Sequence, residues 1–299
     1  MIMENTYRFT PRARFLLAAI VAGASCAASQ PETRGIVPEE IVNARAHKTA
    51  HAAKPKYQPL AGSVTGPMRP ASSPARQIGV TIWKLRAATP ADTGARILVQ
   101  EESNTIDWIP ERVSSASSLR EGDRVRLTME SPEPGYLYVI DRERYSSGER
   151  GSPFLIFPTT RTRGGDNKVM AGKLIDIPAQ DDQPNFFRLR RSRPDQTEEE
   201  LTVLLTPEPL EGIEIGPRPL ALSEEQASEW EKRWGSGKFE IFELTGGAGK
   251  SWTRAEQEAA SRGTRLLTQD DPPPQTVYRV AAKTGDPLLV KIRLRYHRN

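Results

Sequence analysis

A glycine-rich segment between an expected strand and an expected helix is the first place where the sequence suggests chemistry. The segment Gly246–Ser251 (GGAGKS) follows the expected strand Phe239–Leu244 and precedes a helix that begins near Thr253, which is the context of a phosphate-binding loop. That motif requires a glycine where this chain has Leu244. The loop is therefore too short to wrap a phosphate with backbone N–H groups, and we predict a simple connector.

Pairs of acidic residues are the second chemical signal. Asp141 and Glu143, Asp181 and Asp182, and Asp270 and Asp271 stand close together in the sequence. Two carboxyl groups with separated pKa values can hydrolyse a glycosidic bond. Adjacent acids in polar loops are usually solvated, so a hydrolase that uses such loop carboxylates is the alternative to the function favoured below.

Nucleophiles and metal ligands are scarce in this chain. It has one cysteine and three histidines, and only His297 lies in the part expected to fold, three residues from the end. A serine–histidine arrangement would need that terminal residue as its base. Around Gly164–Asn167, one Asp and one Asn fall short of the oxygen ligands that calcium requires. We therefore expect no catalytic residues, no metal and no cofactor.

A polar loop offers the best candidate for contact with a partner. We expect residues 141–153 to join two apolar strands, and this loop carries Arg142, Arg144, Tyr145 and Arg150. Loops on a rigid sheet often carry function, so these four residues form the candidate partner-binding loop. Trp230 and Trp234 share a helix face, for which core packing is favoured over a sugar-stacking platform.

Residues 1–29 have the pattern of an export signal. Arg8, Arg12 and Arg14 precede an apolar run from Phe15 to Ala24, and small residues follow. Cys26 stands where a lipoprotein carries its lipid, although Gly23 replaces the leucine that such a signal prefers; cleavage nearby is the alternative. We expect an exported protein, periplasmic, anchored to the outer membrane or secreted, that meets a membrane only through a lipid at Cys26.

Composition excludes several classes of protein. The 42 Lys and Arg nearly balance 38 Asp and Glu, whereas nucleic-acid binders usually concentrate a large basic excess on one face. We therefore expect no nucleic-acid partner. Residues 30–77 are rich in proline and alanine and poor in large apolar residues, which predicts a disordered linker.

Residues 78–299 are expected to form a single, mainly β domain, an antiparallel sandwich or barrel-like module. Short strands recur with turn signals between them, and the last, Leu288–Tyr296, alternates apolar and basic residues. Two short helices are expected in the C-terminal part, opened by capping boxes at Ser223 and Thr253. We expect the strand Val80–Leu85 to pair with, or lie next to, Leu288–Tyr296, because chain ends often lie close together.

Several motifs in the order of a known family lie between residues 119 and 210. They are Gly122–Leu127 (GDRVRL), Gly135–Ile140 (GYLYVI), Leu155–Pro158 (LIFP), Asn167–Gly172 (NKVMAG), Ile177–Pro178 and Leu201–Leu205 (LTVLL). The series resembles the bacterial domain-of-unknown-function 4384 family. The resemblance implies a β-rich module without established enzymatic activity, flanked here by extensions at both ends. The sequence as a whole favours a non-enzymatic binding or structural module of the bacterial cell envelope, with a protein or envelope component as partner.

Overall fold

The computed structural model describes residues 39–46, 55–60, 75–101, 104–235, 237–261, 265–283 and 285–297. All of them lie in one compact unit that extends from Ile36 to Asn299. Cys26 and the rest of the expected export signal lie outside the described residues.

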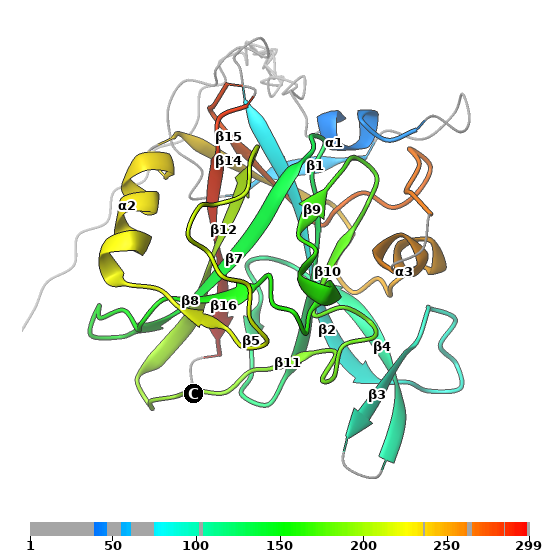
Figure 1. Ribbon diagram of the computed structural model, residues 1–299. Helices are drawn as coiled ribbons and strands as arrows, with labels where there is room; N and C mark the ends of the chain where they lie inside the picture. Colours follow the sequence, from blue (N-terminus) through cyan, green and yellow to red (C-terminus); the bar gives the residue numbers. More distant parts are fainter. Residues whose placement is uncertain are drawn as a thin grey trace, which may run out of the picture. The chain divides into compact units, whose positions relative to one another are not determined.

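Two mostly antiparallel sheets form this unit (Figure 1). The nine-stranded sheet contains β1 (Tyr57–Pro59), β2 (Arg76–Ala87), β3 (Ile97–Glu101), β4 (Asn104–Val113), β6 (Arg124–Glu130), β10 (Ile175–Ile177), β11 (Phe187–Arg188), β14 (Phe239–Leu244) and β15 (Thr276–Val280). The seven-stranded sheet contains β5 (Ser118–Leu119), β7 (Gly135–Tyr145), β8 (Phe154–Phe157), β9 (Lys168–Val169), β12 (Gln196–Thr206), β13 (Leu220–Ala221) and β16 (Leu288–Tyr296). The predicted mainly β fold is confirmed.

Three α-helices lie outside the sheets in the described residues: α1 (Glu39–Asn43), α2 (Glu224–Trp234) and α3 (Arg254–Ala260); a short 3-10 helix covers Arg163–Gly165. The two predicted helix starts are confirmed. The Ser223 side chain accepts a hydrogen bond from the N–H of Gln226, and Thr253 and Glu256 form a complete capping box. These caps supply partners for N–H groups that the first turn of a helix leaves free.

Both sheets contribute to one apolar core. Alternate residues of β2, β6, β7, β12, β15 and β16 meet there, and the four inward side chains of β16 that the sequence indicates, Val290, Ile292, Leu294 and Tyr296, are all buried in it. A clean period of two along each strand gives one apolar face. Because strands from residues 76–130 and 276–296 share this core, both belong to the same compact unit as residues 119–210.

The expected position of the strand Val80–Leu85 is wrong. It belongs to β2, which pairs with β15, β4 and β6, whereas β16 lies in the other sheet between β12 and β5. The two strands contribute to the same core from opposite sheets. Apolar alternation identifies the face that a strand buries, but it does not specify which strand pairs with which.

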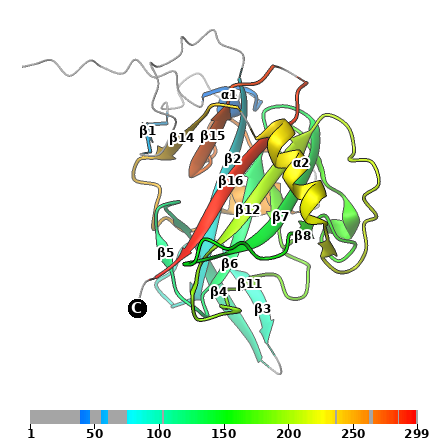
Figure 2. The same cartoon turned by 90° about the vertical axis from the view of Figure 1, so that its left-hand side faces the viewer.

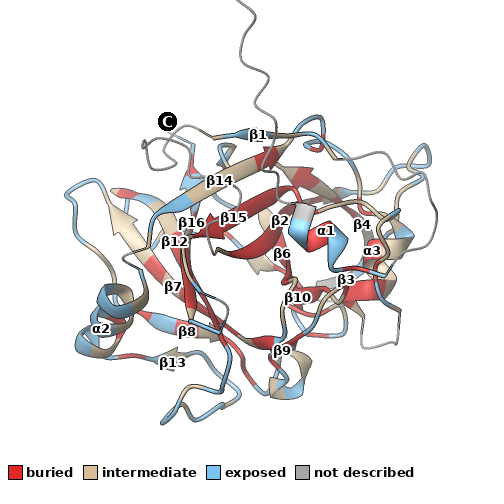
Figure 3. Ribbon diagram, turned by 90° about the horizontal axis from the view of Figure 1, so that it is seen from above, coloured by how far each residue is buried: buried red, intermediate tan, exposed pale blue. Residues whose placement is uncertain are grey.

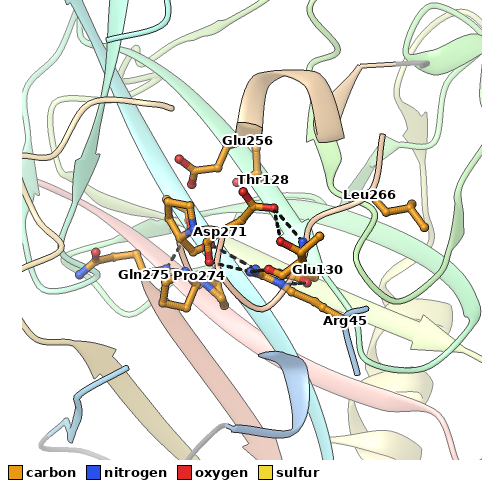
Figure 4. A network of polar contacts seen from close by, with 12 residues as sticks. Arg45, Thr128, Glu130, Glu256, Leu266, Asp271, Pro274 and Gln275 are labelled. Atoms are coloured by element: carbon orange, nitrogen blue, oxygen red, sulfur yellow. Dashed lines mark hydrogen bonds and ion pairs between the residues drawn. The ribbon is translucent and has the colours of Figure 1, made fainter. Parts of the chain in front are cut away.

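Parts of the expected linker fold onto the domain. Ile41, in α1, and Arg45 are almost fully buried, and β1 pairs with β14. The prediction of a disordered segment over residues 30–77 is therefore wrong for residues 39–46, 55–60 and 75–77, where β2 begins at Arg76. The physical reason is an ion pair: Arg45 donates two hydrogen bonds to Glu130, at 2.7 and 2.6 Å (Figure 4), so a segment of low hydrophobicity still finds a strong partner.

The polar face of β6 is covered rather than solvated. Arg126, Thr128 and Glu130 project from the face of the nine-stranded sheet opposite the core, and all three are buried. Arg126 pairs with Asp176, and Arg112 on β4 pairs in the same way with Glu256 of α3. Three arginine–carboxylate pairs thus lie under the layer formed by α1, α3 and the segment before β15.

Candidate functional site

The candidate partner-binding loop is shorter than predicted. Arg142, Arg144 and Tyr145 lie in strand β7, and Arg150 forms an isolated β-bridge with Arg144. The prediction that these residues belong to a loop is wrong for three of the four. The strand extends because Arg142 and Arg144 pair in register with Glu200 and Glu198 of β12, and cross-strand pairs of opposite charge stabilise a sheet.

Two of these arginines connect the seven-stranded sheet to α2, Arg142 through Glu224 and Arg150 through Glu231. Arg142, which is buried, donates to Glu224 at 2.9 Å. Arg144 and Arg150 both reach Glu200, at 2.8 and 3.1 Å. Burial alone would raise the pKa of Glu200, but the hydrogen bond from Arg144 and the nearby positive charges lower it below its usual value. Side chains engaged in this way stabilise the fold, which weakens their assignment as a recognition surface.

The tryptophan pair and the glycine segment also have structural roles. Trp230 and Trp234 stack at 6.1 Å between ring centroids and pack against the apolar cluster between α2 and the sheet, as predicted. In the glycine segment, the N–H of Gly249 donates to Arg112, and that of Lys250 donates to Gly247. Backbone donors that a phosphate loop would present to its ligand are thus bonded to protein carbonyls.

A charged pocket, the Asp141 pocket, lies at the end of β7. Asp141 and Glu143 line this cavity of about 390 Å³ together with Glu149 and with three arginines, Arg142, Arg150 and Arg193. Tyr145 donates a hydrogen bond to Glu143. Burial, with the charges of Glu199 and Glu143, raises the pKa of Asp141 to about 7. The structure therefore brings together one of the acid pairs noted in the sequence and gives one member the pKa of a general acid.

A groove beside β16 is a further feature that the sequence does not indicate. Strand β16 pairs with β12 from Leu288 to Arg295 on one edge, but with β5 only at Arg295 and Tyr296 on the other. Among the described residues, no strand pairs with this second edge between Leu288 and Leu294. Figure 2 shows β16 in front, with α2 on one side and β14 and β15 on the other.

The groove has an apolar wall and a basic rim. It has a volume of about 560 Å³. Phe239 and Ile241 of β14 form the wall with Tyr278 of β15, and Phe239 is 37% exposed. Figure 3 shows β14 largely intermediate or exposed beside the buried β15. We call this feature, lined by Leu60, Ser115, Ala116, Glu231, Gly235, Phe239, Ile241, Tyr278, Leu289, Val290, Lys291, Arg293 and Arg295, the β16 groove.

The sheets differ in extent at this groove, which explains its shape. β14 continues the nine-stranded sheet beyond β15, whereas the seven-stranded sheet ends at β16 along most of that strand. The core-facing side chains of β14 therefore lack a covering strand. Alternation in Phe239–Leu244 predicts the strand, but which part of its apolar face stays open depends on the width of the opposite sheet, which no local pattern encodes.

The described residues contain no group of three or more His, Cys, Asp and Glu side chains placed to hold a metal ion. Among the helices of the described residues, none is both long enough and apolar enough to cross a bilayer. Comparison with family models, with curated proteins and with solved structures finds no match to this chain.

Proposed function

We propose that this protein is a non-enzymatic binding module of the bacterial cell envelope and that the β16 groove is its recognition surface. The observation that carries the proposal is the open edge of β16 beside an exposed apolar wall. A strand edge offers unpaired N–H and C=O groups, and apolar surface left open in a folded domain commonly marks a contact site. The basic and apolar leader and Cys26 support export and a lipid anchor.

The test is an unbiased search for ligands with a groove variant as its control. A peptide library displayed on phage is selected on residues 36–299, and the clones are retested on Ala116→Trp. Ala116 is exposed and lines the groove, so a large ring there fills the groove without disturbing the core. We expect clones that bind the unmodified domain and not the variant. Selection of clones that bind both equally would overturn the proposal.

A second candidate function rests on the acid pair in the Asp141 pocket. A carboxyl group with a pKa of about 7 beside a second carboxylate has the chemistry of the acid and base in glycoside hydrolysis. The alternative is thus an envelope hydrolase in which Asp141 donates a proton to the leaving group and Glu143 acts as its partner carboxylate.

Release of reducing sugar from purified bacterial cell-wall glycan tests this alternative. A hydrolase would show turnover that falls as the pH rises through about 7, where Asp141 loses its proton, and Asp141→Asn would abolish it. Asp270→Asn, an exposed acid outside this pocket, is the matched control. Absence of turnover in the unmodified protein would remove this alternative and leave the groove proposal untouched.

A further inference from the structure

We infer, resting on the proposed function, that the β16 groove takes an extended polypeptide segment that adds a strand to β16 and alternates acidic and apolar side chains. Three features of the groove carry this inference separately: the backbone of β16, the charges on its outward face and the apolar wall across from it.

The backbone of β16 specifies an extended ligand. From Leu288 to Leu294, the edge of β16 away from β12 has no strand partner among the described residues. The strand is straightforwardly alternating, with buried residues between exposed or half-buried ones. Such an edge binds a chain in β conformation through main-chain hydrogen bonds, and the pockets beside it select alternate side chains.

The outward side chains of β16 specify acidic partners. Lys291, Arg293 and Arg295 project to the same face and line the groove. Lys291 is engaged with Glu231 at 2.8 Å, whereas Arg293 and Arg295 are exposed and reach Glu198 only at 3.5 and 3.7 Å. A strand added along Leu288–Leu294 would place alternate side chains opposite Lys291 and Arg293 and diagonal to Arg295, which faces β5, and pairs of opposite charge across strands are favourable.

The inward side specifies apolar partners. The remaining side chains of an added strand would point between the sheets, toward Phe239, Ile241 and Tyr278, which line the groove. Tyr278 belongs to the shared core, and Ile241 packs against its margin. Burial of an apolar side chain there removes from water both its own surface and the exposed ring of Phe239. The ligand pattern is therefore acidic on one face and apolar on the other.

A second copy of this chain fits the same edge poorly. Pairing of two β16 edges over their open part, from Leu288 to Leu294, would bring Lys291 and Arg293 of one copy close to the same residues of the other. Like charges placed opposite each other destabilise a sheet, and charged edges are a common means of preventing such self-association. Charge thus favours a different polypeptide with acidic side chains.

The probe for the test is a fluorescein-labelled octapeptide of alternating Glu and Val, measured by fluorescence anisotropy. We expect saturable binding that weakens with added salt, because the exposed cations are screened. The double variant Arg293→Gln/Arg295→Gln should weaken binding about fivefold or more, because it removes the cross-strand pair at Arg293 and the diagonal charge of Arg295, which itself faces β5. Arg254→Gln, which removes a charge from the exposed surface of α3 outside the groove, should leave the affinity unchanged.

Two further peptides test the geometry. An octapeptide of alternating Lys and Val should not bind. A Glu and Val octapeptide that is N-methylated at alternate residues on its edge toward β16 should also lose binding, since it lacks the donors that a strand requires. Phe239→Ser should weaken binding of the unmodified Glu and Val octapeptide while the circular dichroism spectrum of the domain stays native. This combination distinguishes the loss of one contact from unfolding.

The outcomes separate this inference from the function on which it rests. If phage selection yields groove-dependent peptides without acidic residues, or peptides that tolerate N-methylation, the groove is a binding site but strand addition by an acidic segment is wrong. If no groove-dependent peptide appears, both fail. A domain that dimerises in sedimentation experiments and becomes monomeric in the groove-filling variant Ala116→Trp would identify a second copy as the occupant and overturn the inference.

Discussion

At the scale of single residues, the buried ion pairs depend on each partner being present. Glu130 is 1% exposed, and its two carboxylate oxygens each accept a hydrogen bond from Arg45. A buried carboxylate that loses its partner keeps the desolvation penalty without the compensating charge. The pair therefore holds the N-terminal segment to the nine-stranded sheet.

The first prediction follows from this pair. Arg45→Ala should lower the free energy of unfolding by about 3–5 kcal/mol, the usual cost of leaving a buried charge alone, as measured by urea denaturation. Arg254→Ala breaks an exposed pair with Glu258 and should change stability by less than about 1 kcal/mol. A loss for Arg45→Ala no larger than that of the control would show that the segment before residue 46 does not contribute to stability.

The second prediction concerns the raised pKa of Asp141. A carboxyl group whose pKa is about 7 in the folded protein and about 3.9 in the unfolded chain binds its proton more strongly when folded. Its contribution favours folding at low pH and is lost as the pH rises from about 4 through 7. Asp141→Asn should therefore raise the melting temperature more at pH 8 than at pH 5. An equal shift at both pH values would contradict the raised pKa.

At the scale of elements, β16 joins the core, the helix α2 and the groove. Its inward residues fill the shared core, and Lys291 on its outward face pairs with Glu231 of α2 at 2.8 Å. Because β16 contributes to the core, to the packing of α2 and to the groove, its removal would expose the inner face of the nine-stranded sheet.

The third prediction is that the chain does not fold when it ends before Leu288. This truncation removes the four buried side chains Val290, Ile292, Leu294 and Tyr296. At about 1.5–3 kcal/mol for each fully buried side chain, the loss approaches the whole stability of a typical domain, about 5–15 kcal/mol. A chain that ends after Tyr296 is the matched control and should keep the native circular dichroism spectrum and melt.

The sequence predicts elements better than it predicts their neighbours. The period of two in Leu288–Tyr296 and the capping residues at Ser223 and Thr253 are local signals, and the structure confirms each of them. The docking of Arg45 onto Glu130 spans 85 residues of chain, so no local pattern could reveal it. The burial of Arg126 and Thr128 could not be predicted for the same reason, since the layer that covers these side chains comes from a distant part of the sequence.

In the candidate site too, local features could be predicted from the sequence and long-range contacts could not. Asp141 and Glu143 are visible as a spaced acid pair, and the structure places both in one pocket. Glu199, which helps to raise the pKa of Asp141, comes from β12 and becomes relevant only through strand pairing. The β16 groove depends on the relative widths of two sheets, and therefore on the complete topology.

At the scale of the whole molecule, one core serves both sheets. Buried residues of β2 and β6 from one sheet and of β7, β12 and β16 from the other form a single cluster. Domains larger than about 150 residues often unfold through intermediates, but neither sheet here has a second apolar face of comparable size to retain after the shared core opens. The outer clusters under α2 and α3 are smaller.

The last prediction is that the two sheets unfold together, and the tryptophans allow a direct test. Trp83 and Trp252 lie 5.6 Å apart on the outer side of the nine-stranded sheet, while Trp230 and Trp234 pack outside the seven-stranded sheet. The variant Trp230→Phe/Trp234→Phe removes the reporters of the seven-stranded sheet, and Trp83→Phe/Trp108→Phe/Trp252→Phe removes those of the nine-stranded sheet, because Trp108 packs against the same cluster. Because each sheet loses its inner packing when the other unfolds, both variants should show a single fluorescence transition that coincides with loss of the circular dichroism signal.

Replacement of these rings lowers the unfolding midpoint of each variant by a different amount, so the two probes, fluorescence and circular dichroism, are compared within one variant. A fluorescence midpoint that differs from the circular dichroism midpoint in either variant would mean that the sheets are separate cooperative units.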